Sequence, residues 1–120
     1  MPGILVVEDN NTIRMMYVAG LQGLGMEVLE ARTIEQAKEL LNGGTNPSVV
    51  LLDLRLPGEP GQNLIPYVRN ELKRQDIRII VASALSDMEQ TVLDLGADLF
   101  VRKPIDMPAL LQQIQQFSQS

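Results

Sequence analysis

The sequence predicts an α/β fold in which an open parallel sheet carries helices on both of its faces. Short apolar runs alternate with longer amphipathic segments along the chain, and this alternation is typical of repeated strand–helix–strand units. Several of the runs consist almost entirely of Val, Ile and Leu, as expected for strands that are buried on both faces. A chain of 120 residues has room for one hydrophobic core. We therefore expect residues 1–120 to form a single domain.

Five strands and five helices are predicted from the apolar periodicity. The strands cover residues 4–7, 27–31, 49–52, 78–82 and 99–102. The helices cover residues 11–23, 33–42, 62–73, 87–95 and the chain from about 106 onward. Thr33 fits an N-cap because a Gln follows three residues later, and Pro66 and Pro108 are tolerated in the first turn of a helix. The positions of the first helix expected to face the core are Ile13, Met16, Ala19 and, as a further candidate, Tyr17.

The strict alternation of these elements favours a single-domain, doubly wound (βα)5 sheet of the flavodoxin-like type. Its expected strand order is 2-1-3-4-5, which places strands one and three on either side of the switch point. Ligands of such sheets bind beyond the carboxyl ends of the strands. Residues at those ends are therefore the first candidates for a functional site.

Composition excludes several classes of function. The net charge of −5 argues against direct binding to a nucleic acid, whose phosphates would be repelled. The chain has no Cys and no His, which excludes disulfides, thiolate chemistry and acid, base or metal roles of histidine. No signal peptide is recognisable, and no apolar stretch approaches the roughly 18 residues of a membrane span. We expect a cytoplasmic protein without membrane contact.

Four of the five predicted strands end in polar residues. These are Glu8 and Asp9, Asp53, Ser83, and Lys103. Because the carboxyl ends of parallel strands meet at one edge of the sheet, three carboxylates should gather near the switch point. Taken singly, each feature has a simpler interpretation, such as a helix cap or a turn. Their joint occurrence at the ends of consecutive strands favours a site.

The chemistry of these side chains suits phosphoryl transfer. Clustered carboxylates disfavour one another's ionisation unless a cation joins them, and oxygen ligands without His or Cys suit Mg²⁺. The Ser83 hydroxyl and the Lys103 ammonium suit the oxygens of a phosphoryl group. A carboxylate that faces Mg²⁺ and a lysine can act as a nucleophile toward phosphorus. The pattern predicts that Asp53 accepts a phosphoryl group.

The segments ILVVEDN, VVLLDLRLPG, VASA and GADLFVRKP resemble, in order and spacing, the signature segments of the CheY-like receiver domain of response regulators in two-component signalling. The resemblance covers essentially the whole chain. It implies that Asp53 is the phosphoacceptor and that Asp9, Asp53 and the backbone carbonyl of Arg55 bind Mg²⁺. Glu8 would complete the metal site largely through a metal-bound water.

The resemblance also implies a switch. Ser83 would be the hydroxyl that moves toward the phosphoryl group, Lys103 would contact that group, and Phe100 would rotate into the space that Ser83 leaves. The peptide bond between Lys103 and Pro104 would be cis, as is typical of the family.

By the same resemblance, the phosphoryl group comes from a phosphohistidine of a sensor histidine kinase or a histidine phosphotransfer protein. Phosphorylation would change the face formed by the fourth helix, the fifth strand and the fifth helix, and so control a downstream target or an output domain. The sequence leaves open whether phosphorylation also produces a homodimer through this face. The domain would assist its own phosphorylation and dephosphorylation without being a conventional turnover enzyme.

Three alternatives compete with this interpretation. A haloacid-dehalogenase-type phosphatase needs a second Asp two residues after the nucleophile, where this chain has Arg55. A flavodoxin-like FMN protein needs a phosphate loop rich in Gly and hydroxyl groups after the first strand, where this chain has EDNNTI. The stronger rival is a pseudo-receiver, a protein-binding module that works without phosphorylation.

Outside the site, a solvated cationic face is expected from Arg69, Lys73, Arg74 and Arg78.

Overall fold

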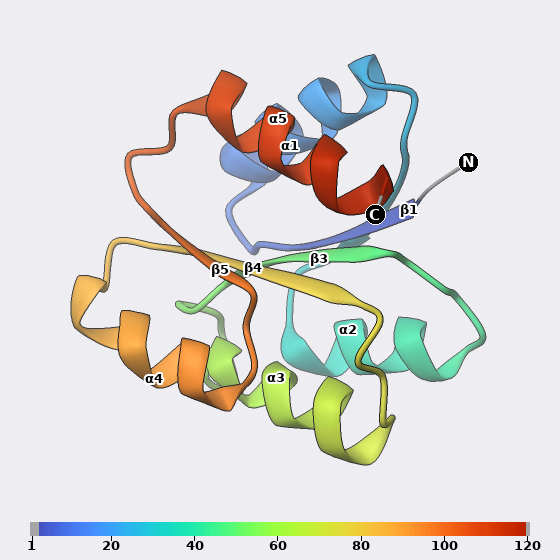
Figure 1. Cartoon of the computed structure of the whole chain (residues 1–120), viewed down its shortest axis with the longest axis vertical. Coiled ribbons are helices and arrows are strands. Elements are labelled where there is room, and N and C mark those ends of the chain that lie inside the picture. The colour runs from blue at the N-terminus through green and yellow to red at the C-terminus, as the bar shows by residue number, and fades with distance from the viewer. Residues whose placement is uncertain (1–2, 120) are drawn as a thin grey trace.

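The computed structural model describes residues 3–119 and contains a parallel sheet in the predicted order, β2-β1-β3-β4-β5. Its strands are β1 (Gly3–Val7), β2 (Glu27–Ala31), β3 (Val49–Asp53), β4 (Arg78–Ser83) and β5 (Leu99–Arg102). Figure 1 shows α1 and α5 on one face of the sheet and α2, α3 and α4 on the other. Those helices are α1 (Asn11–Gly23), α2 (Ile34–Asn42), α3 (Leu64–Pro66), α4 (Glu89–Leu95) and α5 (Met107–Gln119). The predicted fold class is therefore confirmed.

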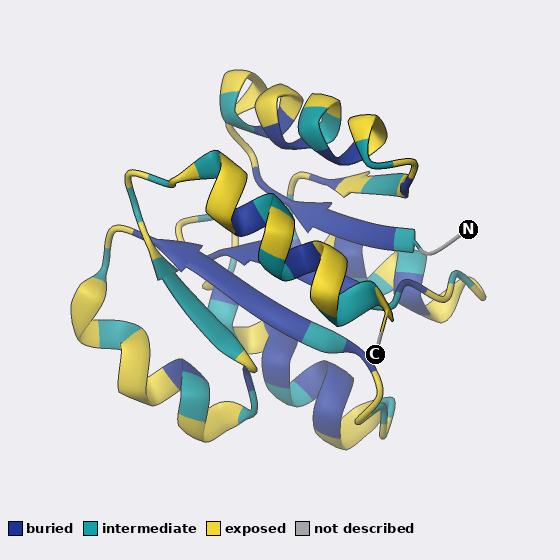
Figure 2. Cartoon of the chain, turned by 45° about the horizontal axis from the view of Figure 1, so that its top comes forward, coloured by how far each residue is buried: buried dark blue, intermediate teal, exposed yellow. Residues whose placement is uncertain are grey.

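Two apolar layers hold the helices against the sheet. Leu5, Val50 and Val81 face the layer that packs under α2, α3 and α4, whereas Ile4 and Leu51 face the layer under α1 and α5. Figure 2 shows the central strands as the most deeply buried elements. Within the described part of the chain, no helix combines the length and the apolar character needed to cross a bilayer.

The helical segment before β4 changes pitch around a proline. A 3₁₀ turn at Gly61–Asn63 leads into α3, and a π-helical stretch follows at Tyr67–Glu71. Pro66 has no N–H to donate and its ring crowds the preceding turn, and such sites are commonly accommodated by local changes of helical pitch. The predicted helix at residues 62–73 is thus present as three short segments.

The first helix is rotated relative to the prediction. Met16 is 58% exposed and Ala19 is also exposed, whereas Arg14, Tyr17 and Leu21 form the buried stripe. The expectation that Met16 and Ala19 face the core was wrong. The physical reason is that the guanidinium of Arg14 donates to the backbone carbonyl of Glu8 at the end of β1. This bond turns the stripe of Arg14, Tyr17 and Leu21 toward the sheet.

The expected solvated cationic face was wrong for Arg69. This side chain is only 9% exposed and donates hydrogen bonds to the carbonyls of Gly96, Arg74 and Ile77 at 2.8–3.0 Å. It also forms an ion pair of 2.9 Å with Asp98. Arg69 therefore ties the segment after α3 to the turn between α4 and β5.

Candidate functional site

The site lies at the carboxyl edge of the sheet, where β1 ends beside β3, and β4 separates β3 from β5. Glu8 and Asp9 directly follow β1, and Asp53 is the last residue of β3. Lys103 directly follows β5. The sheet order therefore brings together side chains that are up to 95 residues apart in sequence.

Three carboxylates form the centre of the site. Glu8, Asp9 and Asp53 each offer an oxygen, and these oxygens lie within 4.8 Å of one another. Glu8 is 2% exposed and Asp53 is 8% exposed, whereas Asp9 opens to solvent. An all-oxygen donor set of this charge, with an open side for water, fits a hard divalent cation such as Mg²⁺.

The electrostatics of the metal-free cluster are unfavourable to full ionisation. Burial and then the neighbouring Asp53 carboxylate raise the pKa of Glu8 above its ordinary value of 4.5. The ammonium of Lys103 and the backbone N–H of Asn10 oppose this rise. A divalent cation would favour the ionised form of Glu8, because opposite charge nearby stabilises a carboxylate.

Lys103 extends from the end of β5 across the site. Its Nζ lies 3.3 Å from Oε1 of Glu8 and 3.5 Å from Oδ1 of Asp53. The peptide bond between Lys103 and Pro104 is cis. The lysine therefore supplies a positive charge beside Asp53, where an incoming anion would need it.

Ser83 ends β4 beside β3 and is almost fully buried. Its Oγ accepts a hydrogen bond of 2.9 Å from the backbone N–H of Leu85. Phe100 is partly buried on β5 and packs against the layer under α2, α3 and α4. Phe100 pairs in register with Val81, which precedes Ser83 by two residues. Ser83 and Phe100 therefore share one face of the sheet, since successive side chains of a strand alternate between faces.

Arg55 lies in the loop after β3, and its side chain is exposed. Within residues 3–119, no hydrogen bond or ion pair joins the Arg55 guanidinium to the acidic cluster. The cluster proper thus consists of Glu8, Asp9, Asp53 and Lys103, with Ser83 at the neighbouring strand end.

Gly61 supports this loop and was missed by the sequence analysis. Its backbone N–H donates to the carbonyl of Leu54 at 3.0 Å. A Cβ at this position would overlap the carbonyl oxygen of Asp53 and lie 2.7 Å from Cα of Leu54. Only glycine allows the loop to pack this closely behind Asp53. The sequence offered just a weak signal, the Gly within GEPG.

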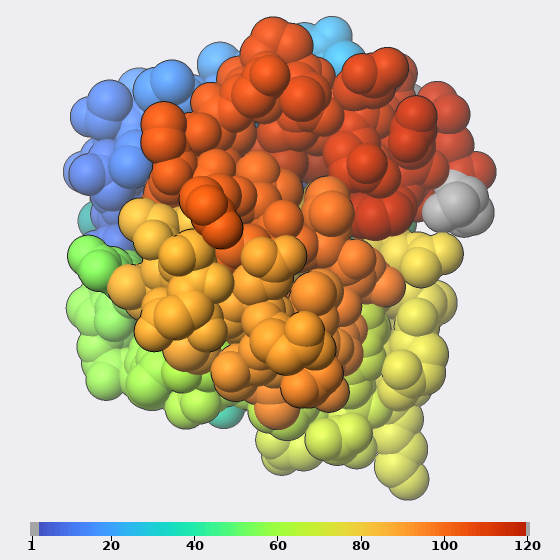
Figure 3. Space-filling view, turned by 60° about the vertical axis from the view of Figure 1, so that its left-hand side comes forward, coloured from blue at the N-terminus to red at the C-terminus, as the bar shows by residue number. Residues whose placement is uncertain are grey.

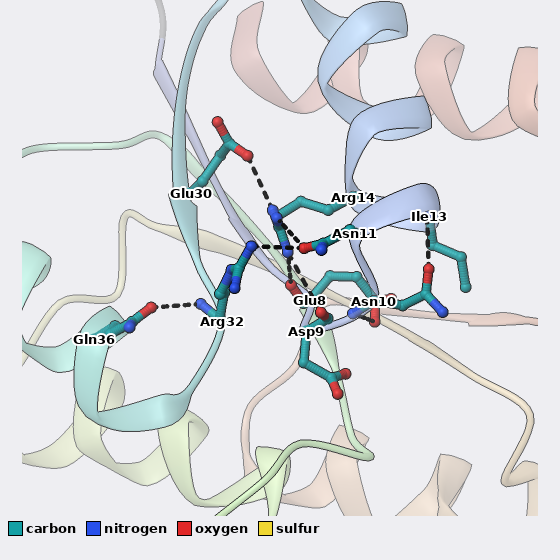
Figure 4. A network of polar contacts seen from close by, with 9 residues as sticks. All are labelled: Glu8, Asp9, Asn10, Asn11, Ile13, Arg14, Glu30, Arg32 and Gln36. Carbon is teal, nitrogen blue, oxygen red and sulfur yellow. Dashed lines mark hydrogen bonds and ion pairs between the residues drawn. The ribbon is translucent and has the colours of Figure 1, made fainter.

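Arg14 is the second residue that the sequence analysis missed. Figure 4 shows its guanidinium among polar groups from the end of β1, the start of α1 and β2. Its Nη1 donates to the backbone carbonyl of Glu8 at 2.9 Å, and its Nε pairs with Glu30 at 3.0 Å. No local pattern marks this arginine as buried, because its partners come from separate elements.

Comparison with known proteins identifies the kind of domain. The sequence model of the response regulator receiver domain matches residues 4–115. The KDP operon transcriptional regulatory protein KdpE of Escherichia coli K12 is 35% identical over 113 residues, which cover 92% of this chain and 48% of that protein. The phosphate regulon transcriptional regulatory protein PhoB of the same organism is 34% identical, with 92% and 49% covered. This chain thus spans about half the length of these relatives.

Solved structures agree with the fold and the family. The response regulator TrrA of Thermotoga maritima, solved in complex with Mg²⁺-BeF, matches with a TM-score of 0.86 and 30% identity. The match covers 98% of this chain and 99% of that one. The similarity to this response regulator therefore extends over nearly the whole chain.

Proposed function

Since the chain belongs to the response regulator receiver domain family, we propose that it is a switch controlled by phosphorylation of Asp53 with Mg²⁺ as cofactor. The observation that carries the proposal is the juxtaposition of three carboxylate oxygens within 4.8 Å and the Lys103 ammonium 3.5 Å from Asp53. We propose that residues 1–120 make up one such domain.

Each residue of the cluster has a role in the transfer. Asp9, Asp53 and the backbone carbonyl of Arg55 would hold Mg²⁺, with Glu8 acting through a water. The ion would neutralise charge on the phosphoryl oxygens. An oxygen of Asp53 forms the new bond to phosphorus while the bond from phosphorus to the donor nitrogen breaks, and that nitrogen keeps the electron pair. Lys103 would bind a phosphoryl oxygen and offset its charge.

The donor in this proposal is a phosphohistidine on a sensor histidine kinase or a histidine phosphotransfer protein. The chain itself contains no His, which fits a division of labour in which the partner supplies it. The complex of TrrA with Mg²⁺-BeF supports the proposal, because it places the metal and a beryllium fluoride on a relative of this chain.

The signal would leave through the face formed by α4, β5 and α5, which Figure 3 shows as a continuous surface. The Ser83 hydroxyl would move toward the phosphoryl group, and Phe100, on the same sheet face, would fill the vacated space. The partner would be a downstream target or an output domain, and a phosphorylation-dependent homodimer would use the same face. The names of KdpE and PhoB describe transcriptional regulators, which favours an output domain that controls transcription.

The experiment is incubation with Mg²⁺ and acetyl phosphate, followed by intact-mass measurement. The wild type and an Asp87→Ala control, which removes an exposed carboxylate in the 3₁₀ turn (Ser86–Met88) before α4, should each gain one phosphoryl group. Asp53→Ala should gain none, and omission of Mg²⁺ should abolish the gain in all samples. A folded wild type that binds Mg²⁺ yet gains no phosphoryl group, from acetyl phosphate or from phosphoramidate, would contradict the proposal and favour the pseudo-receiver.

A further inference from the structure

Arg14 uses all three nitrogens of its guanidinium at the end of β1. Nη1 donates to the carbonyl of Glu8 at 2.9 Å and reaches the carbonyl of Asp9 at 3.5 Å. Nη2 donates to Oδ1 of Asn11 at 2.7 Å, and Nε binds Oε1 of Glu30 at 3.0 Å. The side chain is 8% exposed. A buried charge with every nitrogen engaged is held in one geometry, since the planar fork fixes the directions of its donors.

These contacts act on the backbone of the acidic pair. The two carbonyls belong to Glu8 and Asp9, whose side chains contribute two of the three carboxylates of the site. Asn10, the next residue along the chain, accepts a hydrogen bond from the backbone N–H of Ile13 through its side chain and so caps α1. The turn is therefore fixed at the carbonyl side by Arg14 and at the helix side by Asn10.

The network continues to β2 and α2 (Figure 4). Oδ1 of Asn11 also accepts from Nη2 of Arg32 at 2.7 Å. The backbone N–H of Arg32 donates to Oε1 of Gln36 at 2.8 Å, and the backbone N–H of Gln36 donates to Oγ1 of Thr33, the N-cap of α2, at 3.1 Å. The first turn of α2 is thereby linked, through Arg32 and Asn11, to the guanidinium that holds the acidic turn.

We propose that Arg14 is a positioning residue for the metal site: it fixes the backbone of Glu8 and Asp9 so that their carboxylates converge with Asp53. The inference rests on the proposed Mg²⁺-dependent phosphorylation. Groups that orient metal ligands through hydrogen bonds typically change metal affinity about 10- to 100-fold when they are removed. Arg14 touches no metal or phosphoryl position and acts only through the two acidic residues.

Charge and geometry make opposite predictions for this arginine. As a plain positive charge, Arg14 would repel Mg²⁺, and its removal would tighten binding. As a positioning residue, its removal would loosen the carboxylates and weaken binding. The pairing with Glu30 at 3.0 Å offsets much of the charge, so the geometric effect should prevail.

The test compares Mg²⁺ affinity by titration calorimetry in wild type, Arg14→Met, Arg14→Lys and a charge-matched control. Arg78→Met is that control, because the Arg78 side chain is 43% exposed and pairs with Asp98, away from the network around Arg14. Arg14→Met should bind Mg²⁺ about tenfold more weakly or worse. Arg14→Lys keeps the charge but cannot reproduce the fork and should fall in between. Arg78→Met should stay within about twofold of wild type, the change expected of an exposed charge.

The Mg²⁺ dependence of phosphorylation distinguishes a positioning role of Arg14 from a general loss of stability. With acetyl phosphate as donor, Arg14→Met should need about tenfold more Mg²⁺ for half-maximal phosphorylation and should approach the wild-type rate at saturation. Circular dichroism at the assay temperature establishes that the variants are folded. If Arg14→Met does not fold, Arg14→Lys decides, since weaker Mg²⁺ binding is expected for it as well.

Unchanged or tighter Mg²⁺ binding in a folded Arg14→Met, or in Arg14→Lys where only that variant folds, would overturn the inference and leave the proposed function intact. Absence of Mg²⁺ binding in the wild type would instead contradict the proposed function, and the inference with it. The two failures are therefore distinguishable within one set of titrations.

Discussion

The ammonium of Lys103, at the end of β5, lies 3.3 Å from Oε1 of Glu8, a carboxylate that is only 2% exposed at the end of β1. The same ammonium lies 3.5 Å from Asp53. One lysine thus serves two carboxylates in the metal-free domain. Binding of a divalent cation to those carboxylates would compete with the lysine and release it toward a phosphoryl group.

Replacement of this lysine should separate metal binding from phosphoryl transfer. In Lys103→Met, Mg²⁺ should bind more tightly, because the competing ammonium is gone. Phosphorylation by acetyl phosphate should slow by about tenfold to a hundredfold, the rate equivalent of a charge-assisted hydrogen bond of about 1.5–3 kcal/mol. Calorimetry and a mass-spectrometric time course check the two parts. A variant with weaker Mg²⁺ binding and an unchanged rate would contradict this role.

The raised pKa of Glu8 predicts how stability depends on pH without metal. Burial and Asp53 raise the pKa of this carboxyl above 4.5, so the native state holds a proton that the unfolded state releases. The stability from this group is complete below pH 4.5 and is lost as pH rises through the native pKa. Mg²⁺ affinity should rise over the same window, because the ion requires the carboxylate form.

Glu8→Gln should remove this dependence. Urea denaturation of the metal-free variant should show higher stability than wild type at neutral pH and a flatter profile from pH 4.5 upward. Glu39→Gln, at an exposed position of α2, should retain the wild-type profile. A wild-type protein that gains stability over this window while Glu8→Gln does not would show that the sign is wrong.

Arg69 and Arg78 both pair with Asp98, one buried and one exposed. Replacing the buried Arg69 should lower stability far more than replacing Arg78. Arg69→Met leaves three backbone carbonyls without their donor and should lower the free energy of unfolding by about 3 kcal/mol, as when a buried pair loses one member. Arg78 contacts the same Asp98 at 3.4 Å with a side chain that is 43% exposed. Arg78→Met should therefore lower it by about 1 kcal/mol or less. If urea denaturation shows equal losses of unfolding free energy for the two variants, the larger structural role of Arg69 is refuted.

Gly61 should tolerate no side chain. Gly61→Ala places a Cβ against the backbone of Asp53 and Leu54 and should lower the free energy of unfolding by about 1–3 kcal/mol, the usual effect of overpacking. It should also slow the proposed phosphorylation, because the loop behind Asp53 must shift. Gly23→Ala is the control, since a Cβ there meets nothing within 4 Å, and it should be neutral or slightly stabilising. Similar effects of both substitutions would contradict the steric argument.

Strand-level features of the fold could be predicted because they are local. The continuous apolar run of β3 and its polar end at Asp53 are visible in the sequence itself, and the rules for parallel sheets then bring Asp53 near Glu8 and Asp9. The observed strands β3 and β4 each include one more residue than expected, Asp53 and Ser83. This difference does not change the edge at which their side chains lie.

Contacts between distant backbone groups could not be predicted. Arg69 was expected to be solvated, yet it binds carbonyls from turns that come together only in the folded chain. The inward face of α1 was misplaced for the same reason, since Arg14 is turned inward by carbonyls at the end of β1. Apolar periodicity carries no information about an arginine whose partners are main-chain oxygens.

The most direct test of the central claim is to locate the phosphoryl group on the chain. After phosphorylation with acetyl phosphate and Mg²⁺, borohydride reduction converts an aspartyl phosphate to homoserine, which peptide mass spectrometry assigns to a position. The account predicts homoserine at position 53 in the wild type, with Asp53→Asn left unmodified. Modification at another residue, or none in a folded, Mg²⁺-bound protein, would contradict it.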